Sequence, residues 1–217
     1  MNRSALMDLL ADRICRVKCP HPVRVAIDGV DGVGKTTFAD ELAGPVSNRG
    51  RAVIRASVDC FHNPRAARYR LGRDSPDGYF HDSFNYAALI DVLLAPLGPG
   101  GSRSIRRAIF DERTDSELST PFETTTPDAV LLFDGVFLLR PELRSYWDLA
   151  VFLDAHFEVT VSRGTQRDGT SPDFWQRRYV EGQKLYLKSC EPKRFAAIVV
   201  NNETLASPEI VFDSSDS

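Results

Sequence analysis

Short apolar runs alternate along this chain with segments whose apolar residues recur every three or four positions. Runs of this kind are typical of strands, and the recurring segments are typical of amphipathic helices. Strands are predicted at Val23–Ile27, Ala52–Ala56, Asp128–Phe133, Leu149–Leu153 and Ala196–Val200. Helices are predicted over Leu6–Val17 with Ser4 as the cap, and at Lys35–Asn48, Phe84–Leu94, Glu158–Arg167 and Arg177–Ser189.

Because strands and helices alternate, the strands are expected to pair in parallel, with a crossover helix between them. The apolar runs are continuous, which favours strands buried on both faces. We therefore predict an α/β fold, with a five-stranded parallel sheet and helices on both faces, in a single domain over residues 1–217. Residues 60–80 are predicted to form a long loop and residues 103–120 a β-hairpin. The acidic, serine-rich tail after Pro208 is expected to fray.

The segment Gly29–Thr36 fits the pattern G-x-x-x-x-G-K-[ST] and lies between a predicted strand and a predicted helix. That setting is the one a phosphate-binding P-loop requires, so a P-loop NTPase fold is expected. Its amides and the helix N-terminus favour phosphate oxygens, Lys35 reaches the β- and γ-phosphates, and Thr36 holds Mg²⁺. A glycine-rich turn with a solvated lysine is the alternative, which the flanking pattern disfavours. The candidate cofactor-binding residues here are Gly29, Val30, Asp31, Gly32, Val33, Gly34, Lys35, Thr36 and Thr37.

Carboxylates follow several predicted strands, at the edge where open α/β sheets bind ligands. Asp134 follows the run AVLLF, the position from which an acid supports the magnesium ion. Asp59 follows the second strand and is a candidate base for an attacking hydroxyl, with a simple turn residue as the alternative. Asp154 also ends a strand, so this position alone does not identify a base.

Composition and charge narrow the class of protein. The chain has 27 Lys+Arg and 30 Asp+Glu, a net charge of −3, which argues against a general nucleic-acid binder. Its apolar runs fall far short of a membrane span, and the N-terminal segment lacks the features of a signal peptide. The four cysteines have no metal or redox spacing and are expected to be reduced thiols. A cytoplasmic protein that binds no membrane is expected.

Four motifs occur in one order: the Gly29–Thr36 loop, Asp59-Cys60-Phe61-His62, Phe133-Asp134-Gly135, and Arg163-x-x-x-Arg167-Asp168. Together they resemble the uridine kinase/phosphoribulokinase family of P-loop kinases over nearly the whole chain. The family's strand-end acid is usually Glu, whereas this chain has Asp134. The resemblance implies ATP and Mg²⁺ as cofactors, an acceptor-binding insert at about 60–122 and a lid at about 163–178.

The resemblance also implies roles for individual residues. Asp59 and Lys35 would be catalytic together with the lid residues Arg163 and Arg167, for which an exposed helix face is the alternative interpretation. Thr36 and Asp134 would hold the metal, and Asn201 would contact the base of the nucleotide. The implied acceptor-binding residues are Asp59, His62, Tyr79, Phe110 and Arg178.

The predicted activity is transfer of the γ-phosphoryl group of ATP to a hydroxyl of a nucleoside such as uridine or cytidine. However, Glu112 and Asp115 stand where the family has an aromatic residue and a histidine. The arginines at 65, 68, 70 and 73 are either a solvated loop or the binding site of a phosphate or carboxylate on the acceptor. The alternatives are therefore a kinase of a sugar phosphate, a carboxylated metabolite or a nucleoside monophosphate, and a nucleotide-binding switch. The sequence leaves open whether GTP replaces ATP and whether the protein forms a homo-oligomer.

Overall fold

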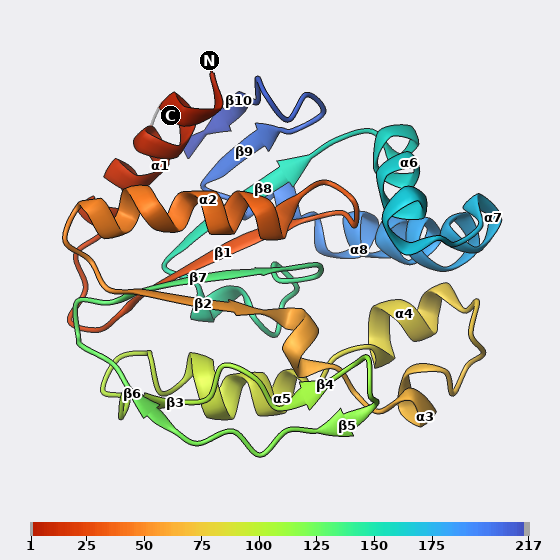
Figure 1. The fold of residues 1–217 in the computed structure, drawn as a ribbon, viewed down its shortest axis with the longest axis horizontal. Helices are drawn as coiled ribbons and strands as arrows, with labels where there is room; N and C mark the ends of the chain where they lie inside the picture. Colours follow the sequence, from red (N-terminus) through yellow and green to blue (C-terminus); the bar gives the residue numbers. More distant parts are fainter. Residues whose placement is uncertain (1, 215–217) are drawn as a thin grey trace.

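A central sheet of six strands organises the computed structural model, which describes residues 2–214. Its strands are β1 (Val23–Gly29), β2 (Val53–Ser57), β7 (Val130–Gly135), β8 (Leu149–Asp154), β9 (Ile198–Asn201) and β10 (Glu209–Asp213). Their order across the sheet is β10-β9-β8-β1-β7-β2, and all neighbouring pairs are parallel except β10 with β9 (Figure 1). The predicted α/β fold and its five parallel strands are confirmed.

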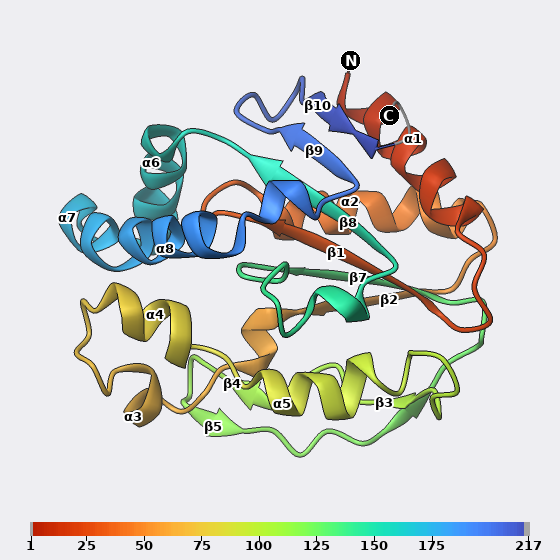
Figure 2. The same cartoon turned by 180° about the vertical axis from the view of Figure 1, so that it is seen from behind.

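Both faces of the sheet are buried, as the continuous apolar runs indicate. Alternate side chains of a strand point to opposite faces, so Val25 and Ile27 of β1 pack on one side while Ala26 packs on the other. The first face is covered by α1 (Arg3–Arg16) and α2 (Lys35–Asn48), and α2 has the bounds that its pattern predicts. Figure 2 shows these helices on one side of the sheet, with the chain between β2 and β7 on the other.

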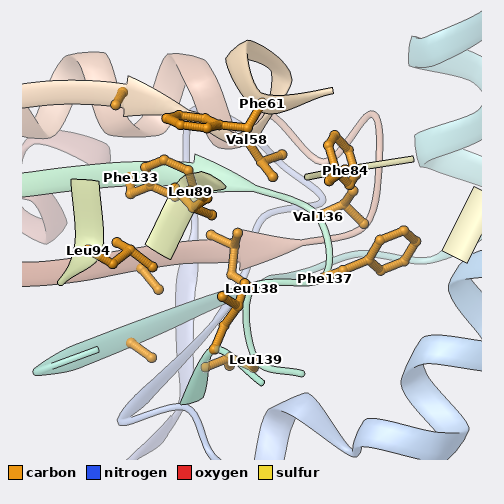
Figure 3. Packing of buried hydrophobic residues seen from close by; sticks show 14 of the residues in the cluster. Val58, Phe61, Phe84, Leu89, Leu94, Phe133, Val136, Phe137, Leu138 and Leu139 are labelled. Carbon is orange, nitrogen blue, oxygen red and sulfur yellow. The ribbon is translucent and has the colours of Figure 1, made fainter. Parts of the chain in front are cut away.

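The chain between β2 and β7 builds the second layer and contributes Phe61, Phe84 and Leu89, among others, to the core cluster on that face. Figure 3 shows part of this cluster, in which Phe61, Leu89 and Leu94 surround Phe133 of β7. Its elements are a 3₁₀ turn (Val58–Phe61), α3 (Arg65–Arg68), α4 (Pro76–Asp82), α5 (Tyr86–Leu89) with a π-helical turn (Ile90–Leu94), and four two-residue strands, β3 (Ser104–Ile105), β4 (Phe110–Asp111), β5 (Ser116–Glu117) and β6 (Glu123–Thr124).

The predicted loop at 60–80 is in fact partly helical, because Pro and Ser residues start two short helices there. Ser75 caps α4 by accepting a hydrogen bond from the Gly78 amide at 3.0 Å. The predicted hairpin at 103–120 forms in part. β4 pairs with β5, while β3 pairs with β6 beyond the predicted range.

The last part of the chain, from β7 onward, supplies the remaining helical elements. Its elements are a 3₁₀ turn (Arg144–Tyr146), α6 (Phe157–Asp168), α7 (Pro172–Phe174) with a π-helical turn (Trp175–Val180), α8 (Glu181–Cys190) and a 3₁₀ turn (Pro192–Arg194). Gly169 ends α6 in the left-handed conformation, at the predicted break. None of the helices described is long and apolar enough to cross a bilayer.

Two predictions about the termini are wrong. The tail after Pro208 does not fray over its described residues, because β10 pairs with β9 and Asp213 forms an ion pair with Arg13 of α1 at 2.7 Å. The cap of α1 is Asn2 rather than Ser4, since the Asn2 side chain accepts a hydrogen bond from the Ala5 amide at 2.8 Å. Residues 215–217 lie outside the described residues.

Candidate active site

The P-loop turns tightly between β1 and α2, and its glycines make that turn and its close packing feasible. Gly32 and Gly34 have φ values of +78° and +96°, which disfavour any residue with a side chain. A Cβ atom on Gly32 would lie 2.2 Å from the carbonyl oxygen of Thr160 in α6. The loop therefore packs directly on α6, and Lys35 and Thr36 open the first turn of α2.

Lys35 and Asp31 face each other within the loop. The Lys35 ammonium donates to the carbonyl oxygen of Val30 at 3.0 Å and lies 3.5 Å from the Asp31 carboxylate. Asp31 also accepts hydrogen bonds from the Tyr79 hydroxyl and, at 3.3 Å, from the Gln183 amide. The Asp31 amide in turn donates to the Gln183 side chain at 2.8 Å. One loop carboxylate thus connects the P-loop to α4 and α8.

Asp134 and Thr36 form a pair of hard oxygen ligands at the end of β7. The Thr36 hydroxyl donates to Asp134 at 2.7 Å, and the register places Asp134 beside Ile27 of β1 and Ser57 of β2. Arg55 holds the other carboxylate oxygen of Asp134 at 2.8 Å. A buried carboxylate oxygen next to a hydroxyl fits the oxygen coordination that Mg²⁺ prefers.

Asp59 lies just beyond the end of β2, in the 3₁₀ turn, and its side chain opens toward the P-loop. Asp59 keeps an exposed surface, but partial desolvation by the surrounding protein raises the pKa of its carboxyl, and the negative charges of Asp31 and Asp134 raise it further. The positive charge of Lys35 acts in the opposite direction. Asp59 lines the same cavity as Asp31, Lys35 and Asp134, so it belongs to the same site as the P-loop.

A cavity of about 1070 Å³ connects these groups. One wall is the P-loop with Asp134, the second comes from α3, α4 and Glu112 of the β4–β5 hairpin, and the third comes from α6 and the segment 167–179. Figure 1 shows α3 and α4 beside α6–α8 at the end of the sheet where β1 and β8 terminate. The predicted insert and lid therefore face each other across the P-loop.

Several predicted site residues line this cavity: Asp31, Gly32, Gly34, Lys35, Thr36, Thr37, Asp59, His62, Tyr79, Asp134, Arg163, Arg167 and Arg178. Arg163 donates to the carbonyl oxygen of Asn202 at 3.3 Å, and Arg167 pairs with Asp168 at 2.6 Å. The Nδ1 of the His62 ring donates to the Asp59 backbone oxygen at 2.9 Å, and the ring centre lies 4.6 Å from that of Phe84. Burial lowers the pKa of His62, which favours its neutral form.

Other predicted site residues lie elsewhere. Phe110 of β4 is a buried hydrophobic residue, 4% exposed, and is not among the residues that line the cavity. Asn201 is also outside the lining, and its side chain accepts a hydrogen bond from the Glu203 amide at 2.9 Å. Val30 and Val33 have buried side chains in the core, and Gly29 packs against Leu153, so these three contribute to the P-loop through the backbone alone.

Two residues of this region were not anticipated from the sequence. Asp28 precedes the loop, is fully buried, and accepts hydrogen bonds from the Gly29 amide at 2.7 Å, the Leu139 amide at 3.0 Å and the Tyr186 hydroxyl. Burial raises the pKa of Asp28 to about 6. Gln183 contacts the loop from α8. An acid inside an apolar strand was the available signal for Asp28, whereas nothing local indicates Gln183.

Comparison with known proteins agrees with this geometry. The profile of the Phosphoribulokinase / Uridine kinase family matches residues 25–172. A uridine kinase of Lactobacillus helveticus is 25% identical over 193 residues, covering 84% of this chain and 88% of its own. A uridine kinase of Ligilactobacillus salivarius is 27% identical over 191 residues, covering 82% and 84%.

A solved structure described as a possible uridine kinase from Bacillus stearothermophilus has the same fold. Its TM-score is 0.74 at 23% identity, over 90% of this chain and 97% of that one. The family profile spans the P-loop, Asp59, Asp134 and the lid arginines, which is well over half of the sequence. The chain therefore belongs to the phosphoribulokinase/uridine kinase family of P-loop kinases.

Proposed function

We propose that the protein transfers the γ-phosphoryl group of ATP, with Mg²⁺, to a hydroxyl group of a nucleoside, with uridine and cytidine as the first acceptors to test. The observation that carries this proposal is the cavity that joins Asp59 to the P-loop. A kinase needs a base that faces the phosphate site, whereas a nucleotide-binding switch does not need one. The relatives described as uridine kinases support the nucleoside.

Positioning and charge provide the catalysis, since phosphoryl transfer needs little covalent chemistry from the protein. The P-loop amides and the N-terminus of α2 bind the phosphate tail, and Lys35 leaves Val30 and Asp31 to reach it. Thr36 and Asp134 would hold Mg²⁺, which neutralises phosphate charge when bound. Arg163 and Arg167 lie on one face of α6 and stabilise the transferring group from the lid side.

Asp59 orients the acceptor hydroxyl and takes its proton as the new P–O bond forms. Its raised pKa makes it a stronger base than an ordinary aspartate, while Lys35 keeps the charged form accessible. A smaller pocket lined by Arg3, Gly34, Thr37, Glu41, Leu205 and Ala206 adjoins the P-loop. We assign the nucleotide base to this pocket, because Gly34 and Thr37 line both cavities.

The test is acceptor-dependent release of ADP from ATP, measured with uridine and cytidine and with Asp59→Asn. The variant is expected to lower kcat by at least 100-fold, the usual contribution of a general base, with little change in the KM for ATP. Asp154→Asn is the matched control. Asp154 also ends a strand, but it pairs with Lys193 away from the cavity, so activity should be retained. Equal activity of Asp59→Asn and the wild type would exclude Asp59 as the base.

A further inference from the structure

Arg178 is buried without a carboxylate partner. Its side chain is only 3% exposed, yet one guanidinium nitrogen donates to backbone oxygens alone, those of Arg73 at 2.9 Å and Ser75 at 3.4 Å. Among residues 2–214, no acidic side chain forms an ion pair with it. A buried guanidinium without a counter-ion is costly, so buried charges are normally paired.

Aromatic rings surround this guanidinium on the acceptor side of the cavity. Its central carbon lies 4.9 Å from the ring centre of Tyr69, 5.3 Å from that of Tyr79 and 5.9 Å from that of Tyr179. The rings supply a partial counter-charge and hold the side chain in place. Within the described residues, its hydrogen bonds and ring contacts are made to the segment 69–79 and to Tyr179 rather than to the P-loop or α6, so Arg178 faces the acceptor rather than the triphosphate.

Arg68 brings a second buried guanidinium to the same ring. It is 4% exposed, its central carbon lies 5.4 Å from the Tyr69 ring centre, and it lines the cavity. Arg68 pairs with Glu112 at 2.9 Å and with Asp115 at 3.3 Å. Nevertheless its Nε–H has no acceptor within the described chain. Of the two interpretations of this arginine cluster, the solvated loop is therefore incorrect for Arg68.

Positive charge is in excess at this end of the cavity. Arg65 and Arg73 also line it, and no ion pair involves either side chain in the part of the chain that the structure describes. The indole N–H of Trp175, which lies one helical turn before Arg178, is buried and likewise lacks an acceptor. A negatively charged ligand that is rich in oxygen would pair with both the unpaired donors and the unpaired cations.

We propose that the acceptor carries an anionic group, a phosphate monoester or a carboxylate, that binds between Arg178 and Arg68 beside the Tyr69 ring. This inference rests on the proposed function, from which it takes the phosphoryl transfer to a hydroxyl group. It differs in the acceptor that it prefers. A hydroxyl compound with such a group, a nucleoside derivative included, is preferred over neutral uridine or cytidine. The anion supplies the missing counter-ion of Arg178 and places the acceptor hydroxyl toward Asp59.

The binding test uses the full chain saturated with Mg²⁺ and a non-hydrolysable ATP analogue, so that the P-loop is filled. Inorganic phosphate and acetate are titrated separately at constant ionic strength, and tryptophan fluorescence is recorded because Trp175 lines the cavity. Saturable binding of one of them is expected, and the stronger of the two identifies the anion. Absence of saturable binding by both would overturn the proposal.

Arg178→Met is expected to weaken that binding at least tenfold, about 1.4 kcal/mol. Arg177→Met is the matched control, because the Arg177 side chain is 59% exposed and pairs with Asp74. Its affinity for the anion should stay within about twofold of the wild type. Equal affinity of Arg178→Met and the wild type would overturn the proposal. Should Arg178→Met fail to fold, Arg178→Lys keeps the charge but loses the planar fork, and it must still weaken binding.

Kinetics separate this inference from the proposed function. Ribose is compared with ribose 5-phosphate, glycerol with glycerate, and uridine is assayed beside them. Arg178→Met should raise the KM of an anionic acceptor at least tenfold and leave the KM for ATP unchanged. Turnover of uridine, combined with an unchanged KM of every anionic acceptor in Arg178→Met, would reject the anion site and keep the kinase. Arg178-dependent anion binding without transfer to any hydroxyl would reject the proposed function and keep the site.

Discussion

Charged side chains near the cavity differ in how their charge is compensated. Asp134 has Arg55 and two hydroxyl groups around it, and Arg68 has two carboxylates. Asp28, directly beneath the P-loop, has only three hydrogen-bond donors and no ion pair among the described residues. Burial outweighs those donors and raises its pKa. The titration of Asp28 therefore affects stability.

The free energy of unfolding should record this titration. Because the pKa of Asp28 rises from 3.8 to about 6 on folding, the folded chain binds the proton more tightly than the unfolded chain. The resulting stabilisation is fully present below pH 4 and is lost as the pH rises through 6, a change of about 3 kcal/mol. In urea unfolding, the stability of the wild type relative to Asp28→Asn should fall by this amount over that range. A difference that does not vary with pH would contradict the prediction.

At the scale of elements, the predicted lid contains one close contact between α6 and the π-helical turn that follows it. A Cβ atom on Gly164 would lie 2.0 Å from the Trp175 ring, so the indole occupies the space that glycine leaves. Trp175 also packs against Tyr179, with ring centres 4.9 Å apart. This contact fixes how the segment with Arg178 sits relative to the lid arginines.

Gly164→Ala is expected to displace the indole and to cost about 1–3 kcal/mol of stability, as overpacking of a core does. The KM for ATP should rise as well, because α6 carries Arg163 and Arg167. Thermal unfolding and steady-state kinetics measure the two effects. Gly44→Ala is the control: it lies in α2 with no neighbouring atom within 4 Å, and it should stabilise the protein by about 0.4–1 kcal/mol. Unchanged stability and KM for Gly164→Ala would show that the indole is free to move.

The accuracy of the predicted elements follows from how local their signals are. The strand, loop and helix around Lys35 form where the pattern indicates, because a period and a motif coincide there. α3 and α7 are too short to show a period, and the sequence therefore predicts loops or breaks for them. Burial of Arg178 is beyond the sequence as well, since its neighbours Tyr69 and Tyr79 come from a distant segment. The same holds for Arg68, whose partners Glu112 and Asp115 lie in the β4–β5 hairpin.

At the scale of the whole molecule, the last segment of the chain forms an edge strand of the sheet that its composition does not indicate. β10 covers β9, although its sequence is acidic and two of its apolar side chains, Val211 and Phe212, are exposed. The ion pair between Asp213 and Arg13 joins this last strand to the first helix. The strand order was not predictable either, because pairing partners lie far apart in the sequence.

Removal of the chain after Pro208 is expected to lower the melting temperature, by roughly 2–4 °C for each kcal/mol lost. It also exposes the β9 edge, which favours self-association. Calorimetry and size-exclusion chromatography test both effects. Asp213→Asn keeps the strand and weakens the ion pair, so it should lower the melting temperature less and leave the oligomeric state unchanged. A truncated chain with wild-type melting and elution would show that β10 adds nothing to the fold.

The carboxylate of Asp31 is expected to couple the binding of the nucleotide thermodynamically to the binding of the acceptor. It is shared by Lys35, Tyr79 and Gln183, so a triphosphate that draws the ammonium away leaves its charge to the other two. Linkage is reciprocal: the factor by which nucleotide alters acceptor affinity through this carboxylate is the factor by which acceptor alters nucleotide affinity. Measuring either dissociation constant with and without the other ligand gives the same coupling energy.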